Sequence, residues 1–573
     1  MANLIVICSP RASANAPDVD HARCAAAALA PDNIKPHAPL IYERDGLVVA
    51  VANPVAGIPV HDGCVCMGRM YGPSGRWWEM QSAAPDGSYV IARHDERRLE
   101  LLTDVLATRP LWYVQTAQRF LASTSQRALI TLLGSFELDQ ESVTWMLTSG
   151  HLGTRSWDTR LRRLPGDSRL TLDLDSWDLR IKTQPLVREP LPLSDAEHVD
   201  RLREAIFATC ASLDLPMDEW LLPLSGGLDS RALLLGLVHA GRRPRCVTWG
   251  ATSSLADVHN DARIATELAA ALGVEHRYYP IEYSATSLEV ALQRFLAAGE
   301  GQVDQFGGYA DGMGVWATFF EDGVAGVIRG DEPALGYYTR YDSELQILRR
   351  WGITFLSEYP PNHPVRSLGL VEQTRDERFR RRPGESLISW YARMFDEFCS
   401  PATLAPLTPI KCAYVEVVNP LQSRRVAEVA RALPDHLMIH RKPLHEMIHS
   451  LGPKIPVATE GALRGTGALV QTDSMVATVT GALAAADSER VLSRPALDKI
   501  VAGLSGEPSA SQAGHGLKDA VKAVVPSRLV DRVRPVWPLR LSGPQLAFRA
   551  FIAVQMADIL TRDACALGKT PVV

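Results

Sequence analysis

The stretch Leu221–Gly241 (LLPLSGGLDSRALLLGLVHAG) constrains the fold more than any other part of the sequence. It predicts a short apolar strand, then a glycine loop, then an amphipathic helix that is closed by a glycine. Gly226 and Gly227 let backbone N–H groups approach an anion without an intervening Cβ, and the start of the helix adds a favourable dipole. This order of elements therefore predicts a phosphate-binding site at the start of the helix.

The polar residues of this loop indicate a magnesium nucleotide as the ligand. Ser225 and Ser230 supply hydroxyl donors, and Asp229 is suited to a Mg²⁺ ion that the phosphates share. The loop has neither the Gly-Lys-Ser/Thr ending of a Walker loop nor the GxGxxG pattern of a dinucleotide turn. The alternative is a strand-to-helix turn that only needs small residues, but such a turn does not call for two serines and an aspartate.

The next elements predict a parallel sheet around this loop. Arg245–Gly250 has the pattern of a second strand, Asp257–Leu272 that of a helix, and Glu275–Ile281 that of a third strand. Val324–Arg329 is a further apolar segment that predicts a buried strand. A βαβαβ run forms a parallel sheet, and ligands bind such a sheet at the carboxyl ends of its strands.

Length and composition exclude several classes of protein. A chain of 573 residues predicts two domains, and the net charge of -5 gives no support to nucleic-acid binding. Leu4–Cys8 is too short for a signal peptide, and no apolar run reaches the length of a membrane helix. Nine scattered cysteines predict reduced thiols, so we expect a cytoplasmic protein without membrane partners.

Residues 1–184 predict a first domain of short strands and turns, with hairpin-like pieces at 104–113, 120–129 and 164–172. The segment HDGCVC (61–66) contains histidine and cysteine, but no second cysteine pair completes a zinc site, so a core strand is the better interpretation. Residues 185–197 predict a proline-rich linker and a helix start, because Ser194 and Glu197 form a capping box for a helix that extends to about Leu213. The second domain is expected to span residues 198–573.

The motif SGGLDS (225–230), the strand ending at Gly250 and the segment DVHNDARIATELAAALGVEH (257–276) resemble the N-type ATP pyrophosphatases, in particular the synthetase domain of asparagine synthetase B and its relatives. The resemblance implies an adenine-nucleotide α-hydrolase-like fold for the second domain, with ATP and Mg²⁺ as cofactors. It implies adenylation of a carboxylate with release of pyrophosphate. The implied nucleotide-binding residues are Leu224, Ser225, Gly226, Gly227, Leu228, Asp229, Ser230, Thr248, Gly250 and Gly330.

The three pieces of the first domain resemble the glutaminase domain of asparagine synthetase, which implies an Ntn-hydrolase-like αββα sandwich. A glutaminase of that kind needs a cysteine nucleophile at the mature N-terminus. Here the chain begins Met1-Ala2-Asn3, and the nearest thiol, Cys8, lies within an apolar strand. We therefore expect an inactive glutaminase-like domain, and ammonia is not the expected nucleophile.

Three further segments carry residues to which the resemblance assigns roles. Asp331 and Glu332 follow the strand 324–329, where the family's acids hold Mg²⁺ and face the reacting carboxyl; capping of the next helix is the alternative. Glu416 matches a family glutamate that helps to deprotonate the attacking amine, although it could equally be an ion-pair residue. In the glycine-containing segment 459–467 the family's lysine is absent, so Arg464 is the expected substitute, on a loop that closes over the site.

The resemblance predicts an ATP-dependent amide-forming ligase. Two relatives lack the N-terminal cysteine: β-lactam synthetases, which act on small amino-acid substrates, and lasso peptide cyclases, which join a peptide's N-terminal amine to an Asp or Glu side chain. A cyclase is favoured, because Trp316, Tyr337 and Tyr338 could line a peptide groove, although they could equally belong to the core. A linear precursor peptide, a leader peptidase and a leader-recognition protein would then be partners. Ammonia-dependent asparagine synthesis stays open, as does a non-catalytic binding protein on the same fold.

Overall fold

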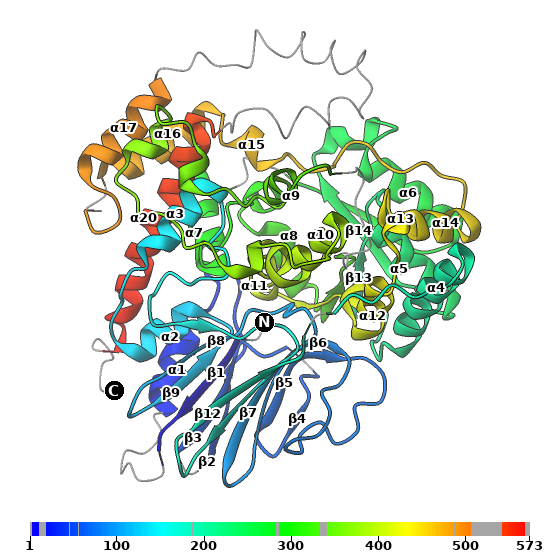
Figure 1. Cartoon of the computed structure of the whole chain (residues 1–573), viewed down its shortest axis with the longest axis horizontal. Helices are drawn as coiled ribbons and strands as arrows, with labels where there is room; N and C mark the ends of the chain where they lie inside the picture. Colours follow the sequence, from blue (N-terminus) through cyan, green and yellow to red (C-terminus); the bar gives the residue numbers. More distant parts are fainter. Residues whose placement is uncertain are drawn as a thin grey trace.

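The computed structural model describes residues 3–10, 19–44, 46–55, 57–185, 187–281, 286–331, 341–485, 489–505 and 541–567. The fold is mixed α/β, with two antiparallel six-stranded sheets and one parallel five-stranded sheet. In Figure 1 the antiparallel sheets form the lower part of the molecule, and the parallel sheet lies above them among helices.

The first antiparallel sheet has the strand order β10-β8-β9-β1-β3-β2. Its strands are β1 (Asn3–Cys8), β2 (Leu40–Arg44), β3 (Leu47–Ala52), β8 (Trp112–Gln115), β9 (Phe120–Ser123) and β10 (Arg162–Arg163). Side chains alternate along β1, so that Leu4 and Val6 face the second sheet while Ile5 and Ile7 face the helices α1 (Val19–Ala28) and α2 (Gln126–Leu133). Cys8 belongs to the core between the two sheets, as expected.

The second antiparallel sheet packs on the inner face of the first and has the order β12-β11-β7-β6-β5-β4. Its strands are β4 (Val60–His61), β5 (Cys64–Met70), β6 (Gly87–His94), β7 (Arg98–Thr103), β11 (Ser168–Asp173) and β12 (Leu179–Thr183). Cys64 and Cys66 lie in a core strand, which confirms the strand interpretation of that segment. The helices α1 and α2 cover the outer face of the first sheet. On the outer face of the second sheet, Trp77 packs against the strands, and among the described residues of this half no helix covers that face.

The helix that follows the linker begins where the sequence predicts. α4 (Asp195–Ser212) has a complete capping box, in which the Ser194 side chain accepts from the Glu197 backbone and the Glu197 side chain accepts from that of Ser194. The linker itself runs along α12 (Arg424–Arg431), since Leu191 N–H donates to the Ala432 carbonyl at 3.0 Å. The linker therefore packs against the second half of the chain.

The parallel sheet has the order β15-β14-β13-β16-β17, which confirms the predicted βαβαβ run. Its strands are β13 (Trp220–Pro223), β14 (Arg245–Gly250), β15 (His276–Pro280), β16 (Gly326–Ile328) and β17 (Glu416–Val418), with α5 (Leu228–His239) and α6 (Asp261–Leu272) as the first two connections. The chain builds outward from β13 on one side and then on the other. The crevice beside β13 is therefore the topological switch point, where ligands bind open parallel sheets.

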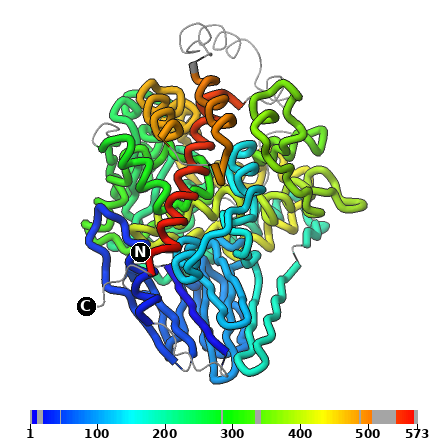
Figure 2. The backbone as a smooth tube through the Cα atoms, turned by 90° about the vertical axis from the view of Figure 1, so that its left-hand side faces the viewer, coloured from blue at the N-terminus to red at the C-terminus, as the bar shows by residue number. Residues whose placement is uncertain are grey.

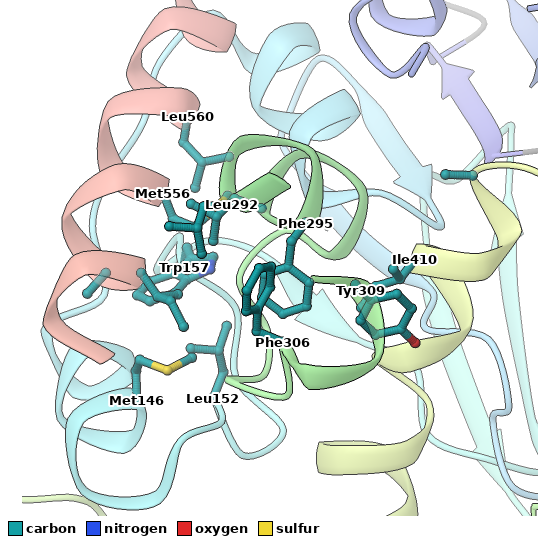
Figure 3. Close-up of a cluster of buried hydrophobic side chains, with 14 of the residues drawn as sticks. Met146, Leu152, Trp157, Leu292, Phe295, Phe306, Tyr309, Ile410, Met556 and Leu560 are labelled. Atoms are coloured by element: carbon teal, nitrogen blue, oxygen red, sulfur yellow. The ribbon is translucent and has the colours of Figure 1, made fainter. Parts of the chain in front are cut away.

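The two halves of the chain share a hydrophobic core, which Figure 3 shows in close-up. Met146 and Trp157 from the first half pack there with Phe295 of α7 (Leu288–Gly299) and Met556 of α20 (Gly543–Ala564). α20, red in Figure 2, runs beside both α2 and α3 (Gln140–Ser149). This shared core fixes the first half against the parallel-sheet half.

The other described helices are α8 (Gly314–Glu321), α9 (Glu344–Arg350), α10 (Leu387–Met394), α11 (Leu407–Cys412), α13 (Asp435–Met438), α14 (Lys442–Leu451), α15 (Thr466–Leu469), α16 (Asp473–Ala485) and α17 (Arg494–Ser505), together with the π-helical turn η6 (Phe395–Leu404). Among the described helices, none has both the length and the apolar character needed to cross a membrane. All nine cysteines are free thiols.

Candidate functional site

The glycine loop connects the carboxyl end of β13 to the start of α5. The hydroxyl groups of Ser225 and Ser230 lie 3.1 Å apart, and the Gly227 N–H donates to Ser225 Oγ at 3.2 Å. The Gly226 N–H donates to Asp261 Oδ1 at 3.0 Å, and burial raises the pKa of that carboxyl. Because the cap residue Gly227 offers no side chain, the first amides of α5 remain available to an anion.

A pocket of about 190 Å³ lies between this loop and the end of β14. Leu224, Ser225, Thr248 and Asp261 line it, and residues 461–463 form its opposite wall. The Thr248 hydroxyl donates to the Leu224 carbonyl at 2.5 Å, which ties the ends of the two strands together. The Leu228 side chain points instead into the core. The pocket therefore lies between the carboxyl ends of β13 and β14, next to the amides that begin α5.

The segment 455–463 covers the loop through backbone contacts. The Ala458 N–H donates to the Gly226 carbonyl at 3.1 Å, and the Ala251 N–H donates to the Ala462 carbonyl at 3.1 Å. A Cβ at Gly226 would lie 2.3 Å from Ala458 Cβ, and one at Gly250 would lie 2.3 Å from the Ala462 carbonyl oxygen. Both glycines are therefore needed for the close approach of this segment.

Arg464, the expected substitute for the family's lysine, follows the covering segment. Its side chain is exposed, and it lines neither the pocket beside Ser225 nor the cavity beside Asp229. The adjacent backbone packs instead on Gly307, whose N–H donates to Thr466 Oγ1 at 2.8 Å. Arg464 thus lines neither of the two spaces that hold the other described candidate residues of the loop and of β16.

A second cavity, of about 440 Å³, opens on the other side of the loop and brings together Asp229, Gly330 and Asp331. The end of β16 approaches the start of α5 so closely that a Cβ on Gly330 would lie 2.9 Å from the Ser230 nitrogen. His151 from the first half of the chain also lines this cavity. Asp229 and Asp331, which are about 100 positions apart in the sequence, thus line the same cavity at the carboxyl ends of the strands. Glu332, Tyr337 and Tyr338 lie outside the described residues.

Three aspartates line the cavity, Asp229, Asp304 and Asp331, and each is paired with an arginine, Asp304 with Arg549 at 2.7 Å. Arg441, buried at the start of α14, contacts Asp229 through both terminal guanidinium nitrogens, Nη1 at 3.2 Å and Nη2. Arg329 donates to Asp331 at 2.7 Å. Burial by itself would raise the pKa of Asp331, but Arg329 and the buried Lys411 together hold that pKa below its ordinary value. Asp331 is therefore an anion despite its burial.

The carboxylates of Asp229 and Asp331 fit a nucleotide-bound magnesium ion, which commonly uses one or two protein carboxylates and takes its other ligands from phosphates and water. A carboxylate has about four lone-pair positions, so an arginine contact leaves room for a cation. Among the described residues no group of three or more His, Cys, Asp or Glu side chains gathers as a self-sufficient metal site. Asp229 and Asp331 would thus need the phosphates to complete the coordination.

Glu416 lies at the opposite edge of the sheet. It pairs in register with Gly326, the first residue of β16, and Gly326 pairs with Trp220, the first residue of β13. Its fully buried carboxylate contacts the guanidinium of Arg109 from the first half and accepts from the Val417 N–H at 2.7 Å. The structure therefore supports the ion-pair alternative for Glu416, away from Asp229.

Sequence reasoning missed three residues of this site. Arg441 lies between His440 and Lys442 in a short basic run that no predicted motif includes, and Lys442 pairs with Asp195 at 2.8 Å on the surface. Asp261 lies in the first turn of the predicted helix, a position that could have suggested a contact with the glycine loop. His151 follows no recognisable motif. Trp316, a candidate for a peptide groove, belongs to the core and is 1% exposed.

No protein-family model matches this chain, and no curated protein matches it. The function is therefore inferred from the two neighbouring cavities and from the residues that line them.

Proposed function

We propose that the protein is an ATP-dependent ligase that activates a carboxylate as its adenylate, releases pyrophosphate and joins the acyl group to an amine. The observation that carries this proposal is the arrangement at the switch point: a glycine loop with available helix amides, flanked by a pocket on one side and a cavity holding Asp229 and Asp331 on the other. The proposed architecture is an inactive Ntn-like sandwich followed by an ATP-pyrophosphatase-like domain.

The two spaces suit the two parts of the reaction. The pocket beside Leu224 and Thr248 would hold the nucleoside, and the amides that begin α5 would bind the phosphates. The cavity beside Asp331 would hold the carboxylate substrate, one oxygen of which attacks the α-phosphorus while the bond to the departing pyrophosphate breaks. The amine then attacks the acyl carbon, loses a proton and displaces AMP. Holding both reactants in one cavity raises their effective concentration.

Charge neutralisation is assigned to residues at the same edge. When bound, Mg²⁺ would neutralise charge on the leaving pyrophosphate, held by Asp229 and Asp331. Arg441 takes the role that the sequence suggested for Arg464, because its guanidinium already contacts Asp229 in the first turn of α5. The covering segment 455–463 would exclude water from an adenylate that is easily hydrolysed.

The favoured substrate is a linear precursor peptide, which would make the protein a lasso peptide cyclase that works with a leader peptidase and a leader-recognition protein in the cytoplasm. The cavity beside Asp331, with Trp351 and Phe395 in its wall, would hold the reacting end of such a peptide. A β-lactam synthetase-like reaction on a small amino-acid substrate is the second candidate. The buried Trp316 gives no support to a peptide groove at that position.

The test follows nucleotide products and peptide mass together, with the full chain, ATP, Mg²⁺ and a linear core peptide encoded beside its gene. AMP and pyrophosphate with a peptide that has lost one water would support the cyclase. AMP without dehydrated peptide would redirect the search to small amino acids. Absence of nucleotide turnover, with any leader-processing partner also supplied, would favour a non-catalytic binding protein.

The matched variants are Asp229→Ala in the cavity and Asp200→Ala on the exposed surface of α4. The first should abolish AMP formation, because it removes the carboxylate nearest the phosphate-binding amides, and the second should not. Equal activity of the two variants would remove Asp229 from the mechanism.

A further inference from the structure

A third and larger cavity, of about 630 Å³, lies between the two halves of the chain. The first half contributes Tyr113 of β8 and the run from Arg162 to Gly166, which covers β10 and the turn before β11. The second half contributes Arg378 and, from the turn η6, Pro401. This volume is within the range of about 300 to 1,000 Å³ that is typical of small-molecule sites.

The guanidinium of Arg163 is the unusual group of this cavity. Its Nη1 donates to the Pro401 carbonyl at 2.5 Å, whereas its Nη2 is buried and has no hydrogen-bond partner among the described residues. Burial, together with the positive charge of Arg378, lowers the pKa of Arg163 to about 9. Trp112 lies beneath the guanidinium, with its ring centre 5.6 Å away. A buried cation with an unused donor is unfavourable unless an anion compensates it.

The protein's own carboxylates do not supply that anion. Of the two acids that line the cavity, Asp396 pairs with Arg431 at 3.2 Å, and Glu397 pairs with Arg393 at 3.1 Å. In the part of the chain that the structure describes, no ion pair includes Arg163. Arg163, one of the residues that line the cavity, therefore carries a positive charge that no described carboxylate pairs with.

Beside its charged and polar residues, the wall of the cavity includes the apolar residues Val105, Pro165 and Pro185. An inorganic ion would leave this surface in contact with water, whereas a molecule with an apolar body would cover it. We propose that the cavity binds a small organic anion, whose carboxylate or phosphate group pairs with Arg163 and whose apolar body packs on these residues.

This site is distinct from the cavity beside Asp229, but the two share one element. Pro401 of η6 faces the anion cavity, while Cys399 and Thr403 of the same turn line the cavity beside Asp229. Neither the glycine loop nor the nucleotide pocket contributes to the anion cavity, so binding there requires no ATP.

The test measures binding to the full chain by titration calorimetry, without nucleotide, using benzoate, phenyl phosphate and the neutral benzamide as probes. At least one of the two anions should bind with a dissociation constant of about 1 mM or tighter, and benzamide should not bind. Which of the two anions binds more tightly distinguishes a carboxylate ligand from a phosphate ligand. Inorganic phosphate should bind more weakly than phenyl phosphate, because it lacks the apolar body.

The deciding variant is Arg163→Met, which keeps an unbranched apolar stem and removes the charge. Loss of one charge-assisted contact should weaken anion binding roughly tenfold or more. Arg203→Met, on the surface of α4, is the matched control and should leave binding unchanged. If Arg163→Met does not fold, Arg162→Ala takes its place, since this residue lines the cavity from an exposed position and should weaken binding roughly threefold.

Failure of both anions to bind would overturn the proposal. So would equal binding of benzoate and benzamide, which would indicate an apolar cavity without an anion site. Binding that Arg163→Met leaves unchanged would place the anion elsewhere, for example at the amides of α5, and would also overturn the proposal.

Discussion

Replacing Glu416 by glutamine should destabilise the protein and should not act selectively on the amine step. The carboxylate is fully buried, and the only described cation that it contacts is Arg109, which is 4% exposed. The variant keeps the shape of the side chain but leaves a buried guanidinium without a countercharge. Breaking a buried ion pair from one side costs about 3 to 5 kcal/mol. We expect about 3 kcal/mol, since the glutamine oxygen can still accept from Arg109.

The measurement is guanidinium-induced unfolding, followed through the fluorescence of tryptophans such as Trp220, which is buried in the parallel sheet. The double variant Arg109→Met, Glu416→Leu removes both charges and should recover most of the lost stability, because apolar residues of similar volume often replace a buried pair without loss. The single variants Arg109→Met and Glu416→Leu, with the double variant and the parent chain, complete a double-mutant cycle for the pair.

A different outcome would refute this reasoning. If Glu416→Gln were as stable as the parent chain, and if it still formed AMP and pyrophosphate but no amide, Glu416 would act on the amine after all. The register of β17, which puts this residue level with the amino end of β13, would then be a poor guide to function.

Three further predictions concern the site itself. Burial, with a smaller effect from Arg549, lowers the pKa of His151 from 6.5 to about 3. As the pH falls below 6.5, the His151 imidazole therefore gains a proton in the unfolded chain but not in the folded one. This histidine should then reduce the free energy of unfolding by about 1.4 kcal/mol per pH unit. In denaturation curves recorded between pH 6.5 and about pH 5, the free energy of unfolding of His151→Gln should depend less on pH than that of the parent chain. Gly226→Ala should weaken ATP binding roughly tenfold by calorimetry, since its Cβ would displace Ala458, whereas Gly465→Ala, with no heavy atom within 4 Å of the new Cβ, should bind as the parent does. Asp229→Asn should slow pyrophosphate release roughly 100-fold, and normal release would exclude a role for its charge.

Local patterns were enough to predict the elements that build the site. The apolar run before Ser225, the two glycines and the helical periodicity after them specify a strand, a loop and a helix, because each depends on neighbouring residues only. The capping box at Ser194 and the strand Arg245–Gly250 were predictable for the same reason. Since these elements follow one another as βαβαβ, the parallel sheet and the edge that carries the loop follow as well.

Contacts between distant residues could not be predicted in this way. Arg109 and Glu416 are 307 positions apart, and no pattern near either residue indicates that they meet. A glutamate in a short buried strand can be a general base or one half of an ion pair. The sequence does not distinguish these roles for Glu416, whereas the register of β17 does. From the sequence, Trp316 could line a groove or belong to the hydrophobic core. The packing of α8 buries it.

The sequence by itself determined the glycine loop and the sheet around it, because strand, turn and helix preferences act over a few residues. Only the tertiary structure decided that Asp229 and Asp331 share a cavity, that Arg441 contacts Asp229, and that Arg163 lies between the two halves with no ion-pair partner among the described residues. Charge compensation and burial depend on which segments meet in space. That meeting is determined by the packing of the whole chain.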